Sequence, residues 1–230
     1  MTNSRYMSDR RPKKLSYTVD VAILTPVRSE LAVLLWRSAE GREKWCLPWD
    51  GPRAGEALEA SAGRIGKAVL GTEPAWMEQI GAFGDGKRHP VDSDISVGYA
   101  LLVPMGTPSP FGGNYAWFPL SDVPQLAPRQ KIVLDSALIA VRSRMDHAPV
   151  AFRLLPQMFT LTELQQMYEL LLGKRLHKAS FRRALQGAWL VEPTDEWRSE
   201  GRGRPAQLYR YAPRKRRPAQ RGIRLDLLSS

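Results

Sequence analysis

Two stretches of the sequence carry side chains whose types and spacing could do chemistry. The first is Leu47 to Thr72 (LPWDGPRAGEALEASAGRIGKAVLGT). In it, the carboxylate of Glu56 and the guanidinium of Arg64 flank the start of a run in which apolar residues recur at helical spacing. A single pair of this kind is unspecific without its context. In the second, Lys178 to Leu190 (KASFRRALQGAWL), cationic and hydroxyl side chains alternate with apolar ones at helical spacing. Such a helix packs one face into a domain and offers donors to base edges and phosphates from the other.

The first stretch resembles the Nudix box, whose pattern is G-x5-E-x7-R-E-U-x-E-E-x-G-U, where U is aliphatic. The first Glu, the Arg and the late Gly of the pattern fall on Glu56, Arg64 and Gly71, whereas the leading Gly falls on Asp50. The two aliphatic positions fall on Gly66 and Thr72, and the three remaining glutamates fall on Ile65, Ala68 and Val69.

These departures decide which chemistry to expect. Nudix enzymes hydrolyse a diphosphate with divalent cations that neutralise phosphate charge and activate water. Mg²⁺ takes oxygen ligands, which carboxylates on one helical face supply, and Ile65, Ala68 and Val69 have none to offer. We therefore expect no hydrolase activity, no catalytic residue, no metal site and no cofactor. The resemblance implies that Glu56 and Arg64 still brace the loop against the helix.

The surroundings of the box extend the resemblance over residues 16–144. Residues 34–37 (LLWR) resemble the strand that precedes the box in Nudix domains. Residues 81–85 (GAFGD) and 95–99 (ISVGY) resemble the strand-loop-strand of the ADP-ribose-binding branch, and residues 117–119 (WFP) resemble the start of its last strand. The resemblance implies a site for ADP-ribose or a related NAD-derived or sugar nucleotide.

Seven residues of these segments are our candidates for that nucleotide site. Without a metal cluster, a diphosphate needs charge-assisted contacts to arginines, and the adenine and ribose need a stacking ring and a polar partner. Because of the segments in which they lie, we predict that Arg37, Arg53 and Arg88 contact the diphosphate. Phe83, Tyr99 or Trp49 would stack on the adenine, and Asp85 would bind the ribose hydroxyls. Trp49 and Asp50 replace the Gly-Gly usual before the helix, so their bulk would close part of the cleft.

The second stretch lies within a longer segment, Phe159 to Tyr211, that resembles the C-terminal domain of the NrtR family of Nudix-related transcriptional regulators. Members of this family place a Nudix domain first and a winged helix second. The resemblance implies a nucleotide-sensing domain and a winged helix that binds a double-stranded DNA operator, often to repress genes of NAD biosynthesis or sugar use. Many members have degenerate Nudix boxes, which agrees with the missing glutamates.

The predicted DNA contacts lie on the helix 178–190, on the turn before it and on the hairpin after it. Around Gly203 the sequence RGR would form the tip of the wing, where glycine permits a tight turn and arginines enter a minor groove or hold phosphates. The predicted DNA-binding residues are Lys174, Arg175, His177, Lys178, Ser180, Arg182, Arg183, Arg202, Arg204 and Arg210.

The net charge of +11 is distributed unevenly along the 230 residues. Residues 147–230 contain sixteen Lys and Arg against seven Asp and Glu, a surplus of nine positive charges. Residues 15–146 have a net charge of −2, and residues 1–14 have +4. A near-neutral body with a basic C-terminal third indicates a polyanion partner for that third. The alternative is a solubilising face.

Other bulk features narrow the cellular setting. No run of about 18 apolar residues is present, and the polar, basic start is unlike a secretory signal. The single cysteine, Cys46, cannot form an internal disulfide. We therefore expect no membrane partner and a reducing, cytoplasmic location.

The order of predicted elements indicates an α+β fold, with a Nudix-type mixed sheet sandwiched by helices and a winged helix-turn-helix after it. Strands are predicted at 17–25, 31–37, 76–83, 95–103 and 115–119, and helices at 54–70, 132–144, 161–172 and 178–190. Short strands are predicted at 191–193 and 208–211, and residues 45–52 are predicted to be irregular. Four segments follow: a basic disordered arm at 1–15, a degenerate Nudix, effector-sensing domain at 16–146, a winged helix-turn-helix domain at 147–213 and a basic tail at 214–230.

Three functions fit these features. The first is a nucleotide-responsive repressor that binds a near-palindromic operator as a homodimer. The second is an active ADP-ribose pyrophosphatase with an accessory domain, which the missing carboxylates disfavour. The third is a constitutive DNA-binding protein whose Nudix domain only supports dimerisation, an alternative that the bulk of Trp49 and Asp50 keeps open.

Overall fold

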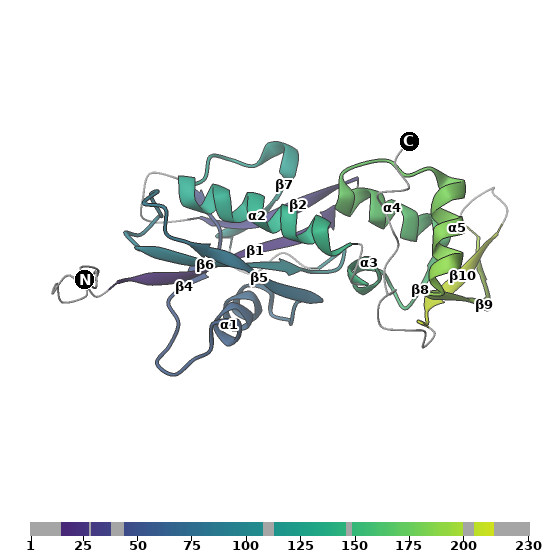
Figure 1. The fold of residues 1–230 in the computed structure, drawn as a ribbon, viewed down its shortest axis with the longest axis horizontal. Helices are drawn as coiled ribbons and strands as arrows, with labels where there is room; N and C mark the ends of the chain where they lie inside the picture. Colours follow the sequence, from purple (N-terminus) through teal and green to yellow (C-terminus); the bar gives the residue numbers. More distant parts are fainter. Residues whose placement is uncertain are drawn as a thin grey trace, which may run out of the picture.

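The computed structural model describes residues 15–27, 29–37, 44–107, 113–145, 149–199 and 205–213. Its two sheets lie toward opposite ends of an elongated molecule, each with helices packed against it (Figure 1). None of the helices in these ranges has the length and apolar character that crossing a membrane requires.

The larger sheet is mixed and, within the described ranges, seven-stranded. Its strands are β1 (Tyr17–Val27), β2 (Glu30–Arg37), β3 (Trp45–Cys46), β4 (Trp49–Asp50), β5 (Trp76–Phe83), β6 (Ile95–Leu102) and β7 (Tyr115–Pro119). They are ordered β3-β2-β1-β6-β5, with β4 paired to β1 and β7 paired to β2. The central pair, β1 and β6, is parallel, and the other pairs are antiparallel. The central strands are apolar because both of their faces are covered.

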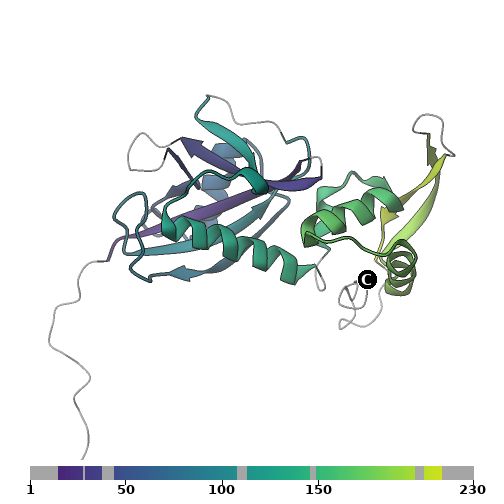
Figure 2. The same ribbon diagram turned by 90° about the horizontal axis from the view of Figure 1, so that it is seen from above.

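Two helices cover the two faces of this sheet, as Figures 1 and 2 show. They are α1 (Leu58–Leu70) and α2 (Pro128–Arg144), the latter preceded by the short 3₁₀ helix η1 (Leu120–Asp122). Alternate residues of a strand point to opposite faces, so Val21 of β1 packs in the core under α1 while Ala22 packs in the core under α2. The left-handed Gly71 (φ 71°) ends α1, as the sequence predicted.

The smaller sheet and its helices form the C-terminal part of the described chain. The elements are α3 (Val150–Leu154), β8 (Met158–Thr160), α4 (Leu161–Leu172), α5 (Lys178–Ala188), β9 (Val191–Arg198) and β10 (Ala206–Tyr211). The three strands are antiparallel in the order β8-β10-β9. Two helices, a short turn and a hairpin in this order form a winged helix, as predicted.

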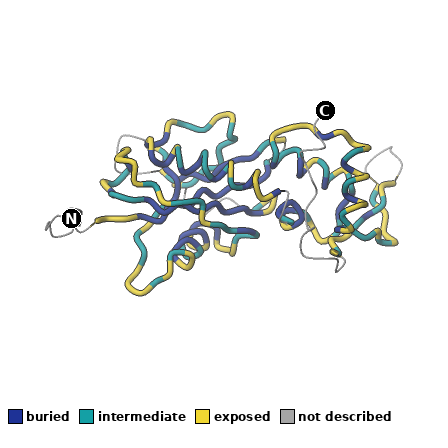
Figure 3. The backbone as a smooth tube through the Cα atoms, in the orientation of Figure 1, coloured by how far each residue is buried: buried dark blue, intermediate teal, exposed yellow. Residues whose placement is uncertain are grey.

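The two parts share one continuous apolar core. Val141 and Met145 at the end of α2 belong to the same buried cluster as Phe152 of α3 and Tyr168 of α4. Figure 3 shows buried backbone in the central strands and again in α3. On the surface, Arg153 of α3 donates a hydrogen bond of 3.2 Å to the carbonyl oxygen of Ala75. The winged helix is therefore packed against the end of α2.

Several predicted boundaries were wrong. Helix α1 begins at Leu58 rather than Ala54, because Gly55 has a φ of 76° that a helix does not allow. Helix α2 begins at Pro128 rather than Ile132, since proline at the first helical position lacks an N–H that would be unpaired anyway. Helix α5 ends at Ala188, β9 extends to Arg198, and residues 45–52 include β3 and β4. The short α3 and β8 were not predicted, because a segment of three to five residues is too short to show the hydrophobic periodicity of a helix or a strand.

Candidate functional site

Arg64 and Glu56 brace the loop before α1, as the resemblance implied. Arg64 donates from Nε to Glu56 Oε1 at 2.8 Å and from Nη2 to Glu56 Oε2 at 2.9 Å. It also donates to Asp50 Oδ2 at 2.6 Å and to the carbonyl oxygen of Gly51 at 3.0 Å. Asp50, which stands where the Nudix pattern has its leading Gly, therefore adds a second carboxylate to the brace. Hydrogen bonds from Arg64, the Arg53 N–H and the Ser61 hydroxyl hold the pKa of Glu56 far below its ordinary value.

The face of α1 that carries glutamates in the Nudix pattern is here an apolar packing surface. Ile65 is 5% exposed and Val69 is 7% exposed, and both belong to the core between α1 and the sheet. Gly66 lets the helix approach closely, because a Cβ there would lie 2.5 Å from Leu101 Cδ2. Ala68 is exposed and has no ligand atom in its side chain. The residues present do not fit a divalent cation.

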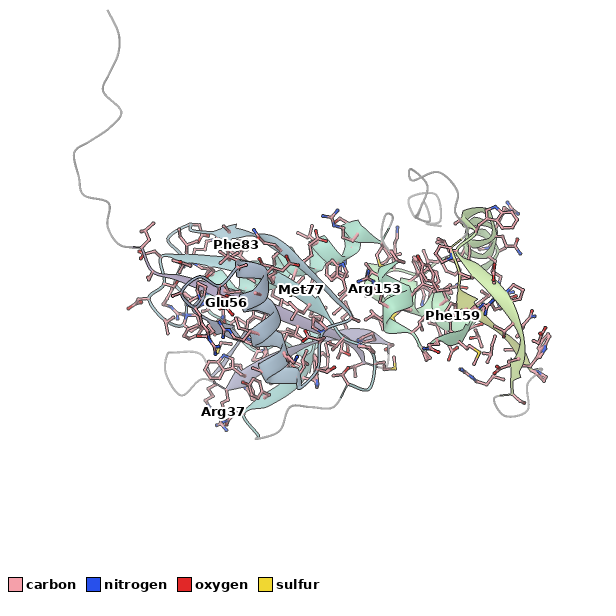
Figure 4. All side chains as sticks on the ribbon, turned by 90° about the horizontal axis from the view of Figure 1, so that it is seen from below. Arg37, Glu56, Met77, Phe83, Arg153 and Phe159 are labelled. Carbon is pink, nitrogen blue, oxygen red and sulfur yellow. The ribbon has the colours of Figure 1, made fainter. Side chains whose placement is uncertain are left out.

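The structure does not bring the seven predicted nucleotide contacts together. Arg37 ends β2 and Phe83 ends β5, which lie toward opposite edges of the sheet. Figure 4 places them on opposite flanks, with Glu56 between them. Tyr99 packs in the core under α1, and its hydroxyl donates to Gln79 Oε1 at 3.0 Å. Burial raises the pKa of Tyr99. Arg53 is exposed in the loop before α1.

Three of the predicted residues do gather near the N-terminus of α2. The ring centroid of Trp49 lies 5.5 Å from that of His89, in an edge-to-face arrangement. Arg88 accepts a hydrogen bond of 3.2 Å at its carbonyl oxygen from the N–H of Arg129, the second residue of α2. The Asp85 carboxylate lies 4.0 Å from Arg129 Nε. The Arg88 carbonyl and the Asp85 carboxylate therefore lie beside the start of α2, and Trp49 lies against His89 of the same loop.

A buried polar network that the sequence analysis missed holds this region in place. Asp20 of β1 is 0% exposed, and its Oδ1 lies 2.8 Å from both His89 Nε2 and the Gln130 amide nitrogen. The Thr18 hydroxyl donates to Asp20 Oδ2 at 2.8 Å. Arg129 donates to the carbonyl oxygen of Ser93 at 2.5 Å, whereas its buried Nε has no hydrogen-bond partner in the described part of the chain. The available signal was a lone aspartate in the apolar run YTVDVAILT.

The surface also has a shallow groove of about 520 Å³ along the outer side of α1. Both small and charged residues of α1 line it, and Met77 of β5 and the exposed ion pair between Lys67 and Glu73 (2.8 Å) contribute to its walls. None of the seven predicted nucleotide contacts lines this groove.

In the winged helix, two carboxylates set the geometry of the helix-turn-helix. Thr160 and Glu163 form the predicted capping box at the start of α4, which is confirmed. Glu169 of α4 accepts hydrogen bonds from Leu176 N–H at 2.9 Å and from Arg175 at 3.1 Å, both in the turn before α5, and from the Gln165 amide at 3.0 Å. Burial alone would raise the pKa of Glu169, but these hydrogen bonds outweigh it and lower the pKa.

Helix α5 presents a cationic face to solvent. Lys178, Arg182 and Arg183 are exposed, and among the described residues no carboxylate forms an ion pair with any of them. Phe181 and Leu185 are buried on the opposite face. The side chains of the predicted contacts Ser180 and His177 lie 3.1 Å apart at the N-terminus of the helix. No side chain of the described residues caps the N-terminus of this helix, and its exposed cations give the face a positive charge.

The other predicted DNA contacts differ in their surroundings. Lys174 and Arg175 are exposed in the turn, and Arg175 pairs with Glu169. Arg210 of β10 lies 3.4 Å from Glu192 of β9. Arg202 and Arg204 lie outside the described residues, as do most of the predicted arm at 1–15, the tail at 214–230 and the boundary at 146–147. A contact that was not predicted joins the hairpin to α4, since Arg198 donates to Glu163 Oε1 at 2.7 Å.

Comparison with known proteins agrees with this arrangement of domains. The family model of the NrtR DNA-binding winged helix domain matches residues 151–211. The ADPR responsive transcriptional repressor NtrR of Acinetobacter baylyi is 30% identical over 218 residues, which cover 91% of this chain and 86% of that protein. The chain belongs to the NrtR family. Membership agrees with the order of its two parts, a Nudix-type sheet followed by a winged helix.

Solved structures agree with membership of the NrtR family. Shewanella oneidensis NrtR complexed with a 27mer DNA has 28% identity and a TM-score of 0.74, covering 89% of this chain and 95% of that chain. A MutT/nudix family protein from Enterococcus faecalis has 20% identity and a TM-score of 0.67, with 90% of each chain covered, and shares the fold. The expected α+β fold, a Nudix-type sheet followed by a winged helix, is confirmed.

Proposed function

We propose that this protein is a transcriptional repressor that binds a DNA operator through its winged helix. The observation that carries the proposal is the cationic face of α5, where Lys178, Arg182 and Arg183 are exposed and form no ion pair with the described carboxylates. The DNA complex of Shewanella oneidensis NrtR and the repressor name of the Acinetobacter relative support it. A homodimer would match two half-sites of an operator, and a protein acting on the chromosome would work in the cytoplasm.

We further infer that residues 16–146 respond to ADP-ribose or a closely related nucleotide without hydrolysing it. The Acinetobacter relative is described as ADPR responsive. Trp49, Asp85 and Arg88 lie near the N-terminus of α2, where the helix dipole favours phosphate. Hydrolysis is disfavoured because the buried Ile65 and Val69 replace carboxylates that would hold a divalent cation. On this proposal residues 147–213 form the DNA-binding unit.

The DNA-binding proposal is tested with a duplex recovered from random sequence by selection with the wild-type protein. We expect Arg182→Ala or Arg183→Ala to lower the affinity for this duplex by about 1–3 kcal/mol if the side chain reads a base. If the side chain instead contacts a phosphate, the slope of log K against log salt should fall by about one. Lys131→Ala, which removes an exposed cation of α2, serves as the control. Unchanged affinity and salt slope in both arginine variants would remove the proposed DNA-binding face.

The sensing proposal is tested by calorimetric titration with ADP-ribose and by repeating the DNA titration in its presence. We expect saturable binding and a changed affinity for the duplex. Incubation with Mg²⁺ and chromatography of the nucleotide should recover intact ADP-ribose. No heat of binding would leave a constitutive DNA-binding protein, and Mg²⁺-dependent cleavage would make the protein a pyrophosphatase.

A further inference from the structure

The C-terminal end of α5 contains a glycine that the fold of the chain does not require. Gly187 lies in the helix, and a Cβ placed on it would meet no atom of the described residues within 4 Å. Its backbone is not in the left-handed region, where glycine is favoured. A helix is less stable with glycine than with alanine at such a position, and neither the backbone conformation nor packing against the described residues accounts for Gly187.

Trp189, the residue that ends α5, stands at a position where glycine is the preferred residue. Trp189 caps the helix in the left-handed conformation (φ 51°, ψ 41°) and is 47% exposed. Two other helices of the described chain, α1 and α4, have glycine at this position, namely Gly71 and Gly173. Non-glycine residues pay for this conformation. The end of α5 therefore has glycine where alanine would stabilise the helix and tryptophan where glycine would.

Gln186 lies on the cationic face of the same helix. It is exposed and follows Arg182 by four positions and Arg183 by three, so the three side chains share one face. Among the described residues its side-chain amide has no hydrogen-bond partner; only its carbonyl oxygen accepts, from Trp189 N–H at 3.3 Å. An amide offers one donor and one acceptor side by side, which matches N7 and N6 of adenine in the major groove.

We propose that Gln186 reads an adenine of the operator in the major groove and that Gly187 lets the sugar–phosphate wall approach the last turn of α5. This inference rests on the proposed DNA-binding function. Arg182 and Arg183, which form no ion pair with a carboxylate of the described residues, lie beside Gln186, and their positive charge favours a polyanion as the occupant of this face.

The base contact is tested on the selected duplex by replacing each adenine in turn with 7-deazaadenine, which lacks the N7 acceptor. We expect one substitution in each half-site to weaken binding by wild-type protein about tenfold, within the range of a bidentate base contact. The same substitution should change the binding of Gln186→Ala less than about twofold, because the partner of N7 is already missing. Equal effects of every substitution on both proteins would overturn the assignment of Gln186.

The glycine is tested by Gly187→Ala, with Gly63→Ala in α1 as the matched control. Gly63 is also helical, and the one atom of the described residues that a Cβ there would meet is Met77 Cε, at 4.0 Å. Both variants should melt about 2–4 °C above wild type without DNA, because alanine is the better helix former. Only Gly187→Ala should weaken duplex binding, about tenfold or more. Binding by Gly187→Ala that equals wild type would overturn the role of Gly187.

Three further results bear on this inference, and the first two separate it from the function on which it rests. If Arg182→Ala weakens binding while Gln186→Ala and Gly187→Ala bind as wild type does, the inference fails and operator binding stands. If the arginine variants are also unaffected, both fail. If Gly187→Ala changes the sedimentation of the free protein, the face contacts a second copy of the chain and the inference is overturned.

Discussion

Replacing Ile65 by glutamate restores a carboxylate where the Nudix pattern has one, and we expect this change to destabilise the protein rather than create a metal site. Ile65 is 5% exposed in the core between α1 and the sheet. Loss of a fully buried isoleucine side chain removes about 3 kcal/mol of burial free energy. If burial raises the pKa of the new carboxyl by about two units, ionisation at neutral pH costs about 3 kcal/mol more. The expected loss is therefore about 6 kcal/mol.

The destabilisation by Ile65→Glu should depend on pH in a defined direction. Burial raises the pKa of the new carboxyl above its unfolded value of about 4.3, so the folded state binds the proton more tightly. The variant should therefore recover part of its stability below about pH 4 and lose it as pH rises through the folded pKa. Urea denaturation followed by circular dichroism at several pH values measures both effects.

Ala68→Glu is the matched control for Ile65→Glu. Ala68 is exposed on the same helix, so a glutamate there stays in water and should change the stability by less than about 0.5 kcal/mol. Equal urea midpoints for Ile65→Glu and wild type at pH 8 would refute the packing role of this face. Mg²⁺-dependent cleavage of ADP-ribose by the Ile65→Glu variant would refute it as well.

Three further changes test the polar contacts. Asp20→Ala should lower the free energy of unfolding by about 3 kcal/mol, because it leaves the buried donors of Thr18, His89 and Gln130 without their acceptor. Urea titration measures this loss, and a loss below about 1 kcal/mol would contradict the prediction. Glu56→Gln should be less stable than wild type at pH 7. The difference in stability should shrink as pH falls below about 4.3, because the Glu56 carboxyl, whose pKa is lowered in the fold, stabilises the fold only while it is ionised. A difference in urea midpoint that stays constant from pH 7 to pH 3 would argue against the brace. Glu169→Ala should weaken binding to specific and non-specific duplexes alike in fluorescence anisotropy, because it releases the turn before α5; a loss confined to the specific duplex would place Glu169 in base reading.

Local signals in the sequence were enough to predict much of the fold. Hydrophobic alternation predicted the strands of the large sheet, and Gly71 and the capping box of Thr160 and Glu163 marked helix ends that the structure has. These features depend on residues a few positions apart, so the sequence alone is enough to predict them. The loss of the metal-binding glutamates was equally readable, since Ile65, Ala68 and Val69 have no oxygen atom in their side chains whatever the fold.

Contacts between distant residues were decided by the tertiary structure alone. Asp20 meets His89 across 69 positions and Gln130 across 110, because the loop after β5 and the start of α2 both pack over β1. Strand order separated Arg37 and Phe83, which segment position had assigned to one site, toward opposite edges of the sheet. Sheet order and helix packing depend on closing long loops over a shared core, and no local spacing specifies which side chains then converge.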